Sequence, residues 1–238
     1  MQLTRLIPAS VLRRIRAVRA AFRMRRVAHA DVRSVFRDIY RDATWGSVGD
    51  GYFSGVGSLD VNSREYIAYV NRFLAGHAVT EIVDCGCGDF RVARQFDLAH
   101  RRYIGVDVVN ELIQRNREAF GTPNIEFRAL DLIEDQLPHG ELCLIRQVLQ
   151  HLSNEAILHV LAKTDQYRYV LITDEQLRAA AHCNRDINSF SGTRNDVGST
   201  LLLERAPFNR KVQVVLETPS AHRRDTYFRT ILITNSPS

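Results

Sequence analysis

Residues 80–90 read Thr-Glu-Ile-Val-Asp-Cys-Gly-Cys-Gly-Asp-Phe, and the prediction of the fold starts here. Thr80–Asp84 is a short apolar run of strand length, and Gly86 and Gly88 follow it closely. Glycine lets the backbone turn sharply and approach a ligand. We predict a strand, a tight turn and a helix over Phe90–Leu98 whose positive N-terminus faces a ligand. The G-x-G pattern alone is a weak signal, because such a turn needs no ligand.

Two further acids stand at the ends of the next two apolar runs. Asp107 ends the run Tyr103–Asp107, and Asp131 follows Ile125–Leu130. Ligands of open α/β sheets bind beyond the carboxyl ends of the strands, so these carboxylates and Asp84 should converge. Asp107 could accept hydrogen bonds from both ribose hydroxyls of a nucleoside, and Asp131 could meet the exocyclic amine of an adenine. Any one of them could be a surface acid, but three consecutive strand ends favour a shared site.

Strands and helices alternate along the middle of the chain, which predicts an α/β fold with a parallel, doubly wound sheet and helices on both faces. Between the second and third strands we expect a helix over Asn110–Phe120, and after the third strand we expect the strands Leu142–Ile145 and Tyr167–Thr173 with the helix Ser153–Ala162 between them. The last two strands, Lys211–Thr218 and Thr226–Thr234, have only a short connection between them. Two strands joined so closely should pair antiparallel.

A basic arm and a glycine-rich loop precede this core. Residues 1–28 hold eight arginines and no acid, with apolar residues at helical spacing, which predicts a basic amphipathic helix. Three interpretations stay open: a helix packed on the domain, a helix on an anionic membrane surface, and a transit peptide. Residues 42–60 hold five glycines and Trp45, and we expect a loop. Asn62 is the expected N-cap of the next helix.

The bulk composition limits the classes of protein. The chain has 238 residues, 45% hydrophobic and 25% charged, which suits one large domain over residues 29–238. No apolar run approaches the roughly 20 residues that span a bilayer. Four cysteines are too few for a disulfide scaffold, and they lack the spacing of a zinc site, so we expect no metal and a cytoplasmic location. The net charge of +5 comes largely from the arm.

Four motifs resemble those of the class I S-adenosylmethionine-dependent methyltransferases, which have a Rossmann-like sheet. They are VDCGCGDF, YIGVDVV, FRALDL and LCLIRQVLQHLS, and the resemblance covers residues 80–174. The closing strand pair also resembles the last two strands of that family, which dinucleotide dehydrogenases usually lack. The loop at Trp45 resembles that of a little-described bacterial subgroup. The resemblance implies an enzyme that uses S-adenosylmethionine as its cofactor.

The resemblance also implies roles for particular residues. Asp84, Gly86 and Gly88 would lie along the methionine part of the cofactor, Asp107 would take the ribose, and Asp131 would lie by the adenine. We place three more residues in the same site: Val108, Leu132 and Trp45. One departure concerns the path of the turn, because Asp89-Phe90-Arg91 stands where the family usually has a third glycine.

Residues that would meet the methyl acceptor follow the fourth strand. Arg146 and Gln147 stand where its apolar run ends, so we expect them to face the cleft. Gln147 would position an acceptor hydroxyl, and Arg146 would bind an anionic group. His151 has two interpretations, a general base or a structural histidine that bonds to backbone, and we favour the second.

The segment 178–209 is polar and rich in turns, and it follows the fifth strand, where the family inserts acceptor-binding elements. Asn188 and Arg194 would cover the cleft as a lid, or the segment is an ordinary solvated loop. Its polar groups favour O-methylation of a small-molecule or glycan acceptor. The use of a general base and the oligomeric state stay open.

Three other functions compete with this interpretation. The basic arm would suit a nucleic-acid methyltransferase, but RQVLQ at 146–150 lacks the Asn/Asp-Pro-Pro-aromatic signature of base-amine methyltransferases, so we do not expect nucleic acid as a partner. A non-catalytic cofactor-binding module shares the fold. A nicotinamide dehydrogenase is disfavoured by the missing third glycine and by the terminal strand pair.

Overall fold

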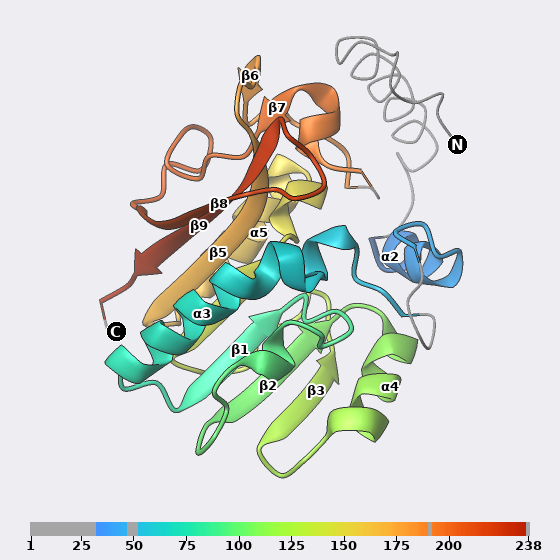
Figure 1. Cartoon of the computed structure of the whole chain (residues 1–238), viewed down its shortest axis with the longest axis vertical. Helices are drawn as coiled ribbons and strands as arrows, with labels where there is room; N and C mark the ends of the chain where they lie inside the picture. Colours follow the sequence, from blue (N-terminus) through green and yellow to red (C-terminus); the bar gives the residue numbers. More distant parts are fainter. Residues whose placement is uncertain (1–31, 47–51, 190–191, 237–238) are drawn as a thin grey trace.

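The computed structural model describes residues 32–46, 52–189 and 192–236, and the predicted basic arm 1–28 lies outside them. Its centre is a seven-stranded sheet in the order β3-β2-β1-β4-β5-β9-β8 (Figure 1). The strands are β1 (Glu81–Cys85), β2 (Arg102–Asp107), β3 (Ile125–Ala129), β4 (Leu142–Arg146), β5 (Tyr169–Leu177), β8 (Gln213–Pro219) and β9 (Thr226–Thr234). Strands β1 to β5 run parallel, and β9 runs antiparallel to β5 and to β8. The predicted α/β sheet with its antiparallel closing pair is confirmed.

Apolar side chains alternate along the central strands and form a core on each face of the sheet. In β1, Val83 belongs to one core and Ile82 to the other. Helix α5 (Asn154–Thr164) packs on the first core, whereas α3 (Asp60–Gly76) and α4 (Asn110–Phe120) pack on the second (Figure 1). Because both faces are covered, the central strands are apolar along nearly their whole length.

The α-helix predicted over Phe90–Leu98 is wrong. This segment forms turns and one short 3₁₀ helix, η2 (Ala93–Gln95). Phe90 has a φ of +62°, which an α-helix does not accommodate. Its ring is buried between Tyr103 and Phe127, with centroids 5.2 and 5.0 Å away. Packing of this ring therefore overrides the local helical spacing, and no α-helix N-terminus follows the glycine turn directly.

Asn62 is not the N-cap that we predicted. Helix α3 begins at Asp60, with Leu59 as N-cap, and Asn62 is buried within its first turns. The Asn62 side chain accepts a hydrogen bond from the Ala221 backbone N–H at 2.9 Å and donates to Val56 O at 2.9 Å. It therefore ties the start of α3 to the connection between β8 and β9. The preceding loop contains one 3₁₀ turn, η1 (Val56–Ser58).

The described residues of the segment 178–209, namely 178–189 and 192–209, are folded and do not form merely a solvated loop. They contain two short parallel strands and a 3₁₀ helix, namely β6 (His182–Cys183), β7 (Ser199–Thr200) and η4 (Arg194–Val197). Leu201, Leu203 and Phe208 are buried in the core that α5 covers. These apolar residues anchor the segment against the body of the protein.

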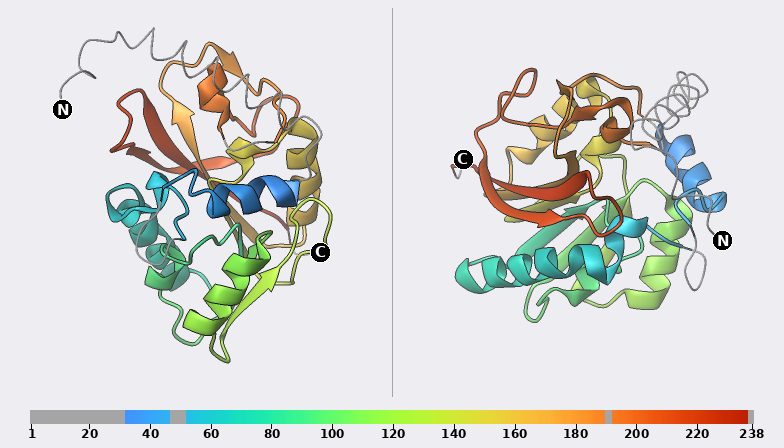
Figure 2. Two further views of the ribbon diagram at one scale, coloured as in Figure 1. Left: turned by 90° about the vertical axis from the view of Figure 1, so that its right-hand side faces the viewer. Right: turned by 45° about the horizontal axis from the view of Figure 1, so that its top comes forward.

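Helix α2 (Val32–Arg41) lies across the carboxyl ends of the parallel strands, as Figure 2 shows from the side. Between α2 and α3 the structure describes residues 42–46 and 52–59, and Ser54 among them accepts a hydrogen bond from the Asp89 backbone N–H in the turn after β1. Helix α2 and the residues that follow it therefore cover the site predicted at the strand ends. Among the described residues, no helix is long and apolar enough to cross a bilayer.

Candidate functional site

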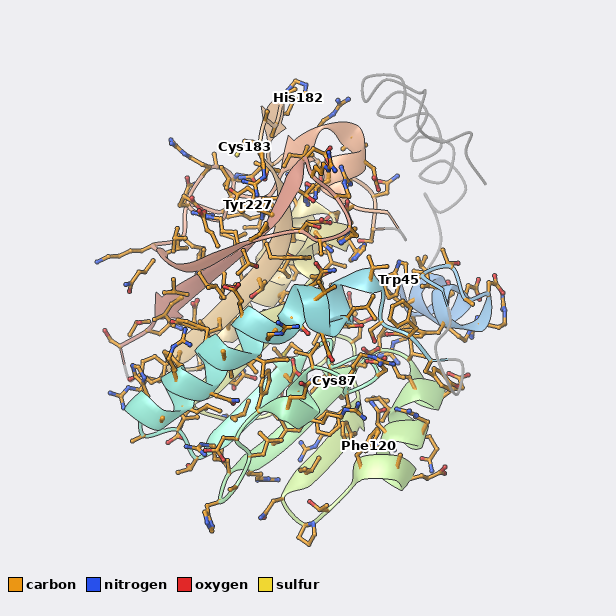
Figure 3. The ribbon with its side chains drawn as sticks, in the orientation of Figure 1. Trp45, Cys87, Phe120, His182, Cys183 and Tyr227 are labelled. Atoms are coloured by element: carbon orange, nitrogen blue, oxygen red, sulfur yellow. The ribbon has the colours of Figure 1, made fainter. Side chains whose placement is uncertain are left out.

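A cavity of about 360 Å³ lies at the carboxyl ends of the parallel strands. All eight residues predicted for the cofactor site line it, namely Asp84, Gly86, Gly88, Trp45, Asp107, Val108, Asp131 and Leu132. In Figure 3, Trp45 lies next to α2 and Cys87 at the turn after β1, far from His182 and Cys183 on β6. The structure thus brings together side chains from the ends of three strands and from the described residues between α2 and α3, 42–46 and 52–59, which we call the covering segment.

The glycine turn after β1 has a left-handed backbone that residues with a Cβ rarely adopt. Gly86 and Gly88 have φ angles of +82° and +55°. A Cβ on Gly86 would collide with Val148, and one on Gly88 would collide with Ser54 Oγ. The backbone N–H of Gly86 donates to Val106 O at 2.7 Å, which ties the turn to β2. The two glycines are therefore required by the turn and by what covers it.

Asp107 fastens the glycine turn to the end of β2. Its Oδ2 accepts a hydrogen bond from Gly88 N–H at 3.1 Å, and its Oδ1 accepts one from Val109 N–H at 3.2 Å. Burial raises the pKa of Asp107 to about 6, although these hydrogen bonds oppose the shift. Burial also raises the pKa of Asp84 to about 6, and Tyr103 donates a hydrogen bond to Asp84 at 2.7 Å. Both carboxyls are mainly ionised at neutral pH.

Asp131 lies in the same cavity but is held differently. Its Oδ1 accepts a hydrogen bond from the Ile133 backbone N–H at 2.8 Å. Arg33 of α2 lies 3.6 Å from its Oδ2 and also donates to Asp135 at 2.9 Å. Asp131 therefore links the loop after β3 with the helix that covers the site.

The covering segment is bonded to the glycine turn. Ser54 Oγ accepts a hydrogen bond from the Asp89 backbone N–H at 2.8 Å and lies 3.0 Å from the Tyr40 hydroxyl. Phe36 packs edge-on against Trp45, with centroids 6.1 Å apart. Phe36, Tyr40 and Ser54 all line the cavity, and none of them was predicted. Their sequence context shows no strand end or motif that points to them.

Arg146 and Gln147 line the cavity, as expected from their place at the end of β4. Arg146 donates hydrogen bonds to Gly57 O at 2.8 Å and to Asn62 O at 3.3 Å. The Gln147 amide, with its oxygen towards the guanidinium, accepts from Arg146 at 3.1 and 3.3 Å. Gln147 has a φ of +58°, a strained conformation that functional sites often hold. Arg146 therefore anchors the covering segment, so its hydrogen-bonding groups are not all left for an anion.

His151 is buried at the cavity wall. Its Nδ1 lies 2.6 Å from Gly192 O, so this nitrogen carries the proton that it donates. The ring also packs against Trp45 and Phe36, with centroids 5.5 and 6.1 Å away. These contacts favour the structural interpretation over a general base.

The structure corrects the roles predicted for Arg194 and Asn188. Arg194 is 1% exposed and donates hydrogen bonds to Leu152 O at 2.6 Å and to Arg185 O, so its guanidinium faces backbone and not the cleft. Asn188 is exposed and is not among the residues that line the cavity. The segment does reach the cavity, but through Gly192, Thr193 and Asp196.

Three further cavity residues, Glu175, His222 and Arg223, were not predicted. Glu175 lies near the end of β5, two residues beyond the strand end that we expected. His222 and Arg223 lie in the connection between β8 and β9. Among the described residues, no group of three His, Cys, Asp or Glu side chains is arranged to hold a metal ion.

No protein-family model and no curated protein matches the sequence. Solved structures do match the fold. Magnesium protoporphyrin IX methyltransferase (ChlM) from Synechocystis PCC 6803, with bound S-adenosylmethionine, has a TM-score of 0.58 at 16% identity, over 88% of this chain and 99% of that chain. The 1,6-didemethyltoxoflavin-N1-methyltransferase from Burkholderia thailandensis, with bound 1,6-didemethyltoxoflavin and S-adenosylhomocysteine, has a TM-score of 0.55 at 18% identity, over 86% and 88%.

Human N-acetylserotonin methyltransferase in complex with S-adenosylmethionine has a TM-score of 0.52 at 14% identity, over 96% of this chain and 68% of that chain. These identities are low, so the likeness concerns the fold. The strand order and the antiparallel closing pair agree with it. The chain has the Rossmann-like fold of the class I S-adenosylmethionine-dependent methyltransferases.

Proposed function

We propose that the protein is an S-adenosylmethionine-dependent methyltransferase. One observation carries this proposal: the glycine turn, Asp107 and Asp131 come from three consecutive strand ends and line one cavity. The four motifs that suggested this function from the sequence supply the same residues. Structures that share the fold hold S-adenosylmethionine or S-adenosylhomocysteine, which supports the choice of cofactor.

The residues would divide the cofactor among them as follows. The Asp107 carboxylate would accept hydrogen bonds from the ribose hydroxyls, and Asp131 would lie by the adenine with Val108 and Leu132. The turn Gly86–Gly88 and Asp84 would lie along the methionine part. An ionised Asp84 would also face the cationic end of the methionine, which favours binding.

Methyl transfer from a sulfonium is an in-line displacement, so the protein mainly aligns the two reactants and excludes water. The cover formed by α2 and the segment around Ser54 suits this task, because it is hydrogen-bonded to the glycine turn. His151 would support the wall of the site without taking a proton. Arg146 would hold the cover closed through Gly57.

We infer a small-molecule acceptor, with an oxygen atom of a small molecule or glycan as the methylated group. The polar residues on the β5 side of the cavity support this inference. We also propose that residues 29–238 form one domain, that the protein acts in the cytoplasm, and that the arm 1–28 contacts anionic membrane peripherally.

Thermal unfolding with added S-adenosylhomocysteine or NADH tests the function. S-adenosylhomocysteine should raise the melting temperature, because a ligand of the native state stabilises it, and NADH should not. Transfer of labelled methyl groups to small-molecule, RNA and DNA fractions of a cell extract would then locate the acceptor. Stabilisation by NADH alone would indicate a dehydrogenase, and labelled RNA or DNA would replace the small-molecule proposal. Binding without any transfer would indicate a non-catalytic module.

A further inference from the structure

Glu175 lies on the side of the cavity opposite to the predicted cofactor residues. Asp84 is the last residue but one of β1 and Asp107 is the last residue of β2, whereas Glu175 belongs to β5. Strand β4 runs between β1 and β5 in the sheet. The cavity therefore extends past the end of β4 to Glu175. A group that receives a methyl from a cofactor bound over β1 and β2 would occupy this end.

The Glu175 carboxylate is buried and held by two side chains. Its Oε1 accepts hydrogen bonds from Thr226 Oγ1 at 2.5 Å and from His222 Nε2 at 3.2 Å, and the side chain is 8% exposed. Burial raises the pKa of Glu175, but the hydrogen bonds from His222 and Thr226 outweigh it and hold the pKa below its usual value. The group is thus a fixed carboxylate at neutral pH.

The orientation of His222 follows from its other neighbours. The Asn62 amide is fixed by Ala221 N–H and Val56 O, so its Nδ2 points a hydrogen at His222 Nδ1, 3.3 Å away. Ser220 Oγ also lies 3.0 Å from Nδ1. Nδ1 must therefore accept, and Nε2 carries the proton that it donates to Glu175. A ring held in this way positions the carboxylate, and its Nε2 is not available as a base.

One oxygen of this carboxylate is left for a ligand. In the described part of the chain, both hydrogen bonds to the carboxylate go to Oε1, and none goes to Oε2. The nearby cations are already engaged: Arg223 donates to both oxygens of Asp225 at 3.2 and 3.1 Å, and Arg146 donates to Gly57 O. An anionic oxygen on a largely buried side chain that lines a cavity favours a hydrogen-bond donor as its ligand.

We propose that Glu175 Oε2 binds a hydroxyl or ammonium group of the methyl acceptor: a bound hydroxyl would be the methylated oxygen, whereas an ammonium group, which has no free electron pair, would anchor a substrate that is methylated at another atom. This inference rests on the proposed methyltransferase function. His222 and Asn62 are positioning residues, because they act through Glu175. No proton transfer is assigned to any of them.

The test uses simple probes on the protein saturated with S-adenosylhomocysteine. Phenol and benzylamine carry a donor, whereas anisole and toluene are their counterparts without one. Saturation-transfer NMR should show that phenol or benzylamine binds, and Glu175→Gln should weaken that binding about tenfold or more, because a hydrogen bond to a charged group is lost. Phenol alone would indicate a hydroxyl, and benzylamine alone an ammonium group. Anisole and toluene should bind equally to both proteins.

Two controls keep the outcomes separate. Glu217→Gln removes a carboxylate from the exposed outer strand β8 and should leave all four probes unchanged. Calorimetry with S-adenosylhomocysteine should give the same affinity for Glu175→Gln as for the unmodified protein. If the unmodified protein does not bind S-adenosylhomocysteine, the proposed function is refuted. If phenol and benzylamine bind equally to the unmodified protein and to Glu175→Gln, the role of Glu175 is refuted.

If Glu175→Gln does not fold, the unmodified protein still gives a decision. A bound donor probe should show a nuclear Overhauser effect to the ring protons of His222, which lies beside Glu175 at the cavity rim with 28% of its side chain exposed. Contacts of the probes only with other parts of the protein would overturn the proposal.

Discussion

The backbone N–H of Gly88 donates a hydrogen bond to Asp107 Oδ2 at 3.1 Å, so the residue expected to bind the ribose also holds the glycine turn in place. This contact joins the turn after β1 to the end of β2. An intact turn and an intact carboxylate are therefore parts of one binding unit, and changes to either should affect the cofactor.

Replacing Gly88 by Ala should disturb this unit. The φ of +55° costs a residue with a Cβ roughly 1–2 kcal/mol, and the new methyl would also collide with Ser54 Oγ. We expect lower stability and weaker binding of S-adenosylhomocysteine, measured by thermal unfolding and calorimetry. Gly76→Ala is the matched control, because nothing lies within 4 Å of a Cβ there. Unchanged binding in Gly88→Ala would show that the turn does not meet the ligand.

Replacing His151 by Ala should lower the melting temperature and change the methyl-transfer rate only modestly. The side chain bonds to Gly192 O and packs on Trp45, so its loss removes a buried hydrogen bond and ring contacts, about 1–3 kcal/mol. The measurements are thermal unfolding and labelled methyl transfer. An unchanged melting temperature with a transfer rate lowered by orders of magnitude would make His151 the general base instead.

Replacing Arg194 by Ala should destabilise the segment 178–209. Two backbone carbonyls, those of Leu152 and Arg185, would lose a charged donor in a buried place, at a cost of about 2–4 kcal/mol. Arg224→Ala is the control, because that side chain is exposed. Calorimetry should show unchanged affinity for S-adenosylhomocysteine in the folded variant, and an unchanged melting temperature would contradict this assignment.

Binding of S-adenosylhomocysteine should weaken below about pH 6. Ribose hydroxyls donate to an ionised Asp107, whose pKa burial raises to about 6 from 3.8, so affinity should fall about tenfold per pH unit below that value. The free energy of unfolding of the protein without ligand, in contrast, increases as the pH falls. Because the folded state binds more protons than the unfolded state between about pH 4 and 6, Asp107 and Asp84 lower stability as the pH rises through that range.

Fluorescence of Trp45, the only tryptophan and a cavity residue, can follow this titration. Asp107→Asn should bind more weakly throughout and should show a flatter pH dependence, with the remaining slope due to Asp84. Affinity that is constant between about pH 8 and pH 5 in the unmodified protein would exclude an ionised Asp107 as the ribose ligand.

The strand ends were predictable because their signal is local. Apolar runs mark β1 to β4, and the parallel arrangement alone brings Asp84, Asp107 and Asp131 to one edge of the sheet. Phe90 shows the opposite case. Its left-handed backbone follows from burial among rings of other strands, which helical spacing within residues 90–98 does not reveal.

Glu175 was missed because polar residues normally mark the end of a strand. We expected the fifth strand to stop at Thr173, but β5 continues to Leu177, with every residue buried. Other segments satisfy the polar groups there: Gln176 Oε1 accepts from Leu201 N–H at 2.9 Å, and Glu175 accepts from Thr226. The partners lie far away in the sequence, so local polarity misled the prediction of both the strand and the site.

Calorimetric titration of S-adenosylhomocysteine into the unmodified protein and into Asp107→Ala tests the central claim most directly. The unmodified protein should bind the ligand at one site. Removal of the Asp107 carboxylate should weaken binding by about 2–4 kcal/mol, taking charged hydrogen bonds at about 1.5–3 kcal/mol each with incomplete additivity. Equal affinity in a folded Asp107→Ala protein, or no binding to the unmodified protein, would contradict the account.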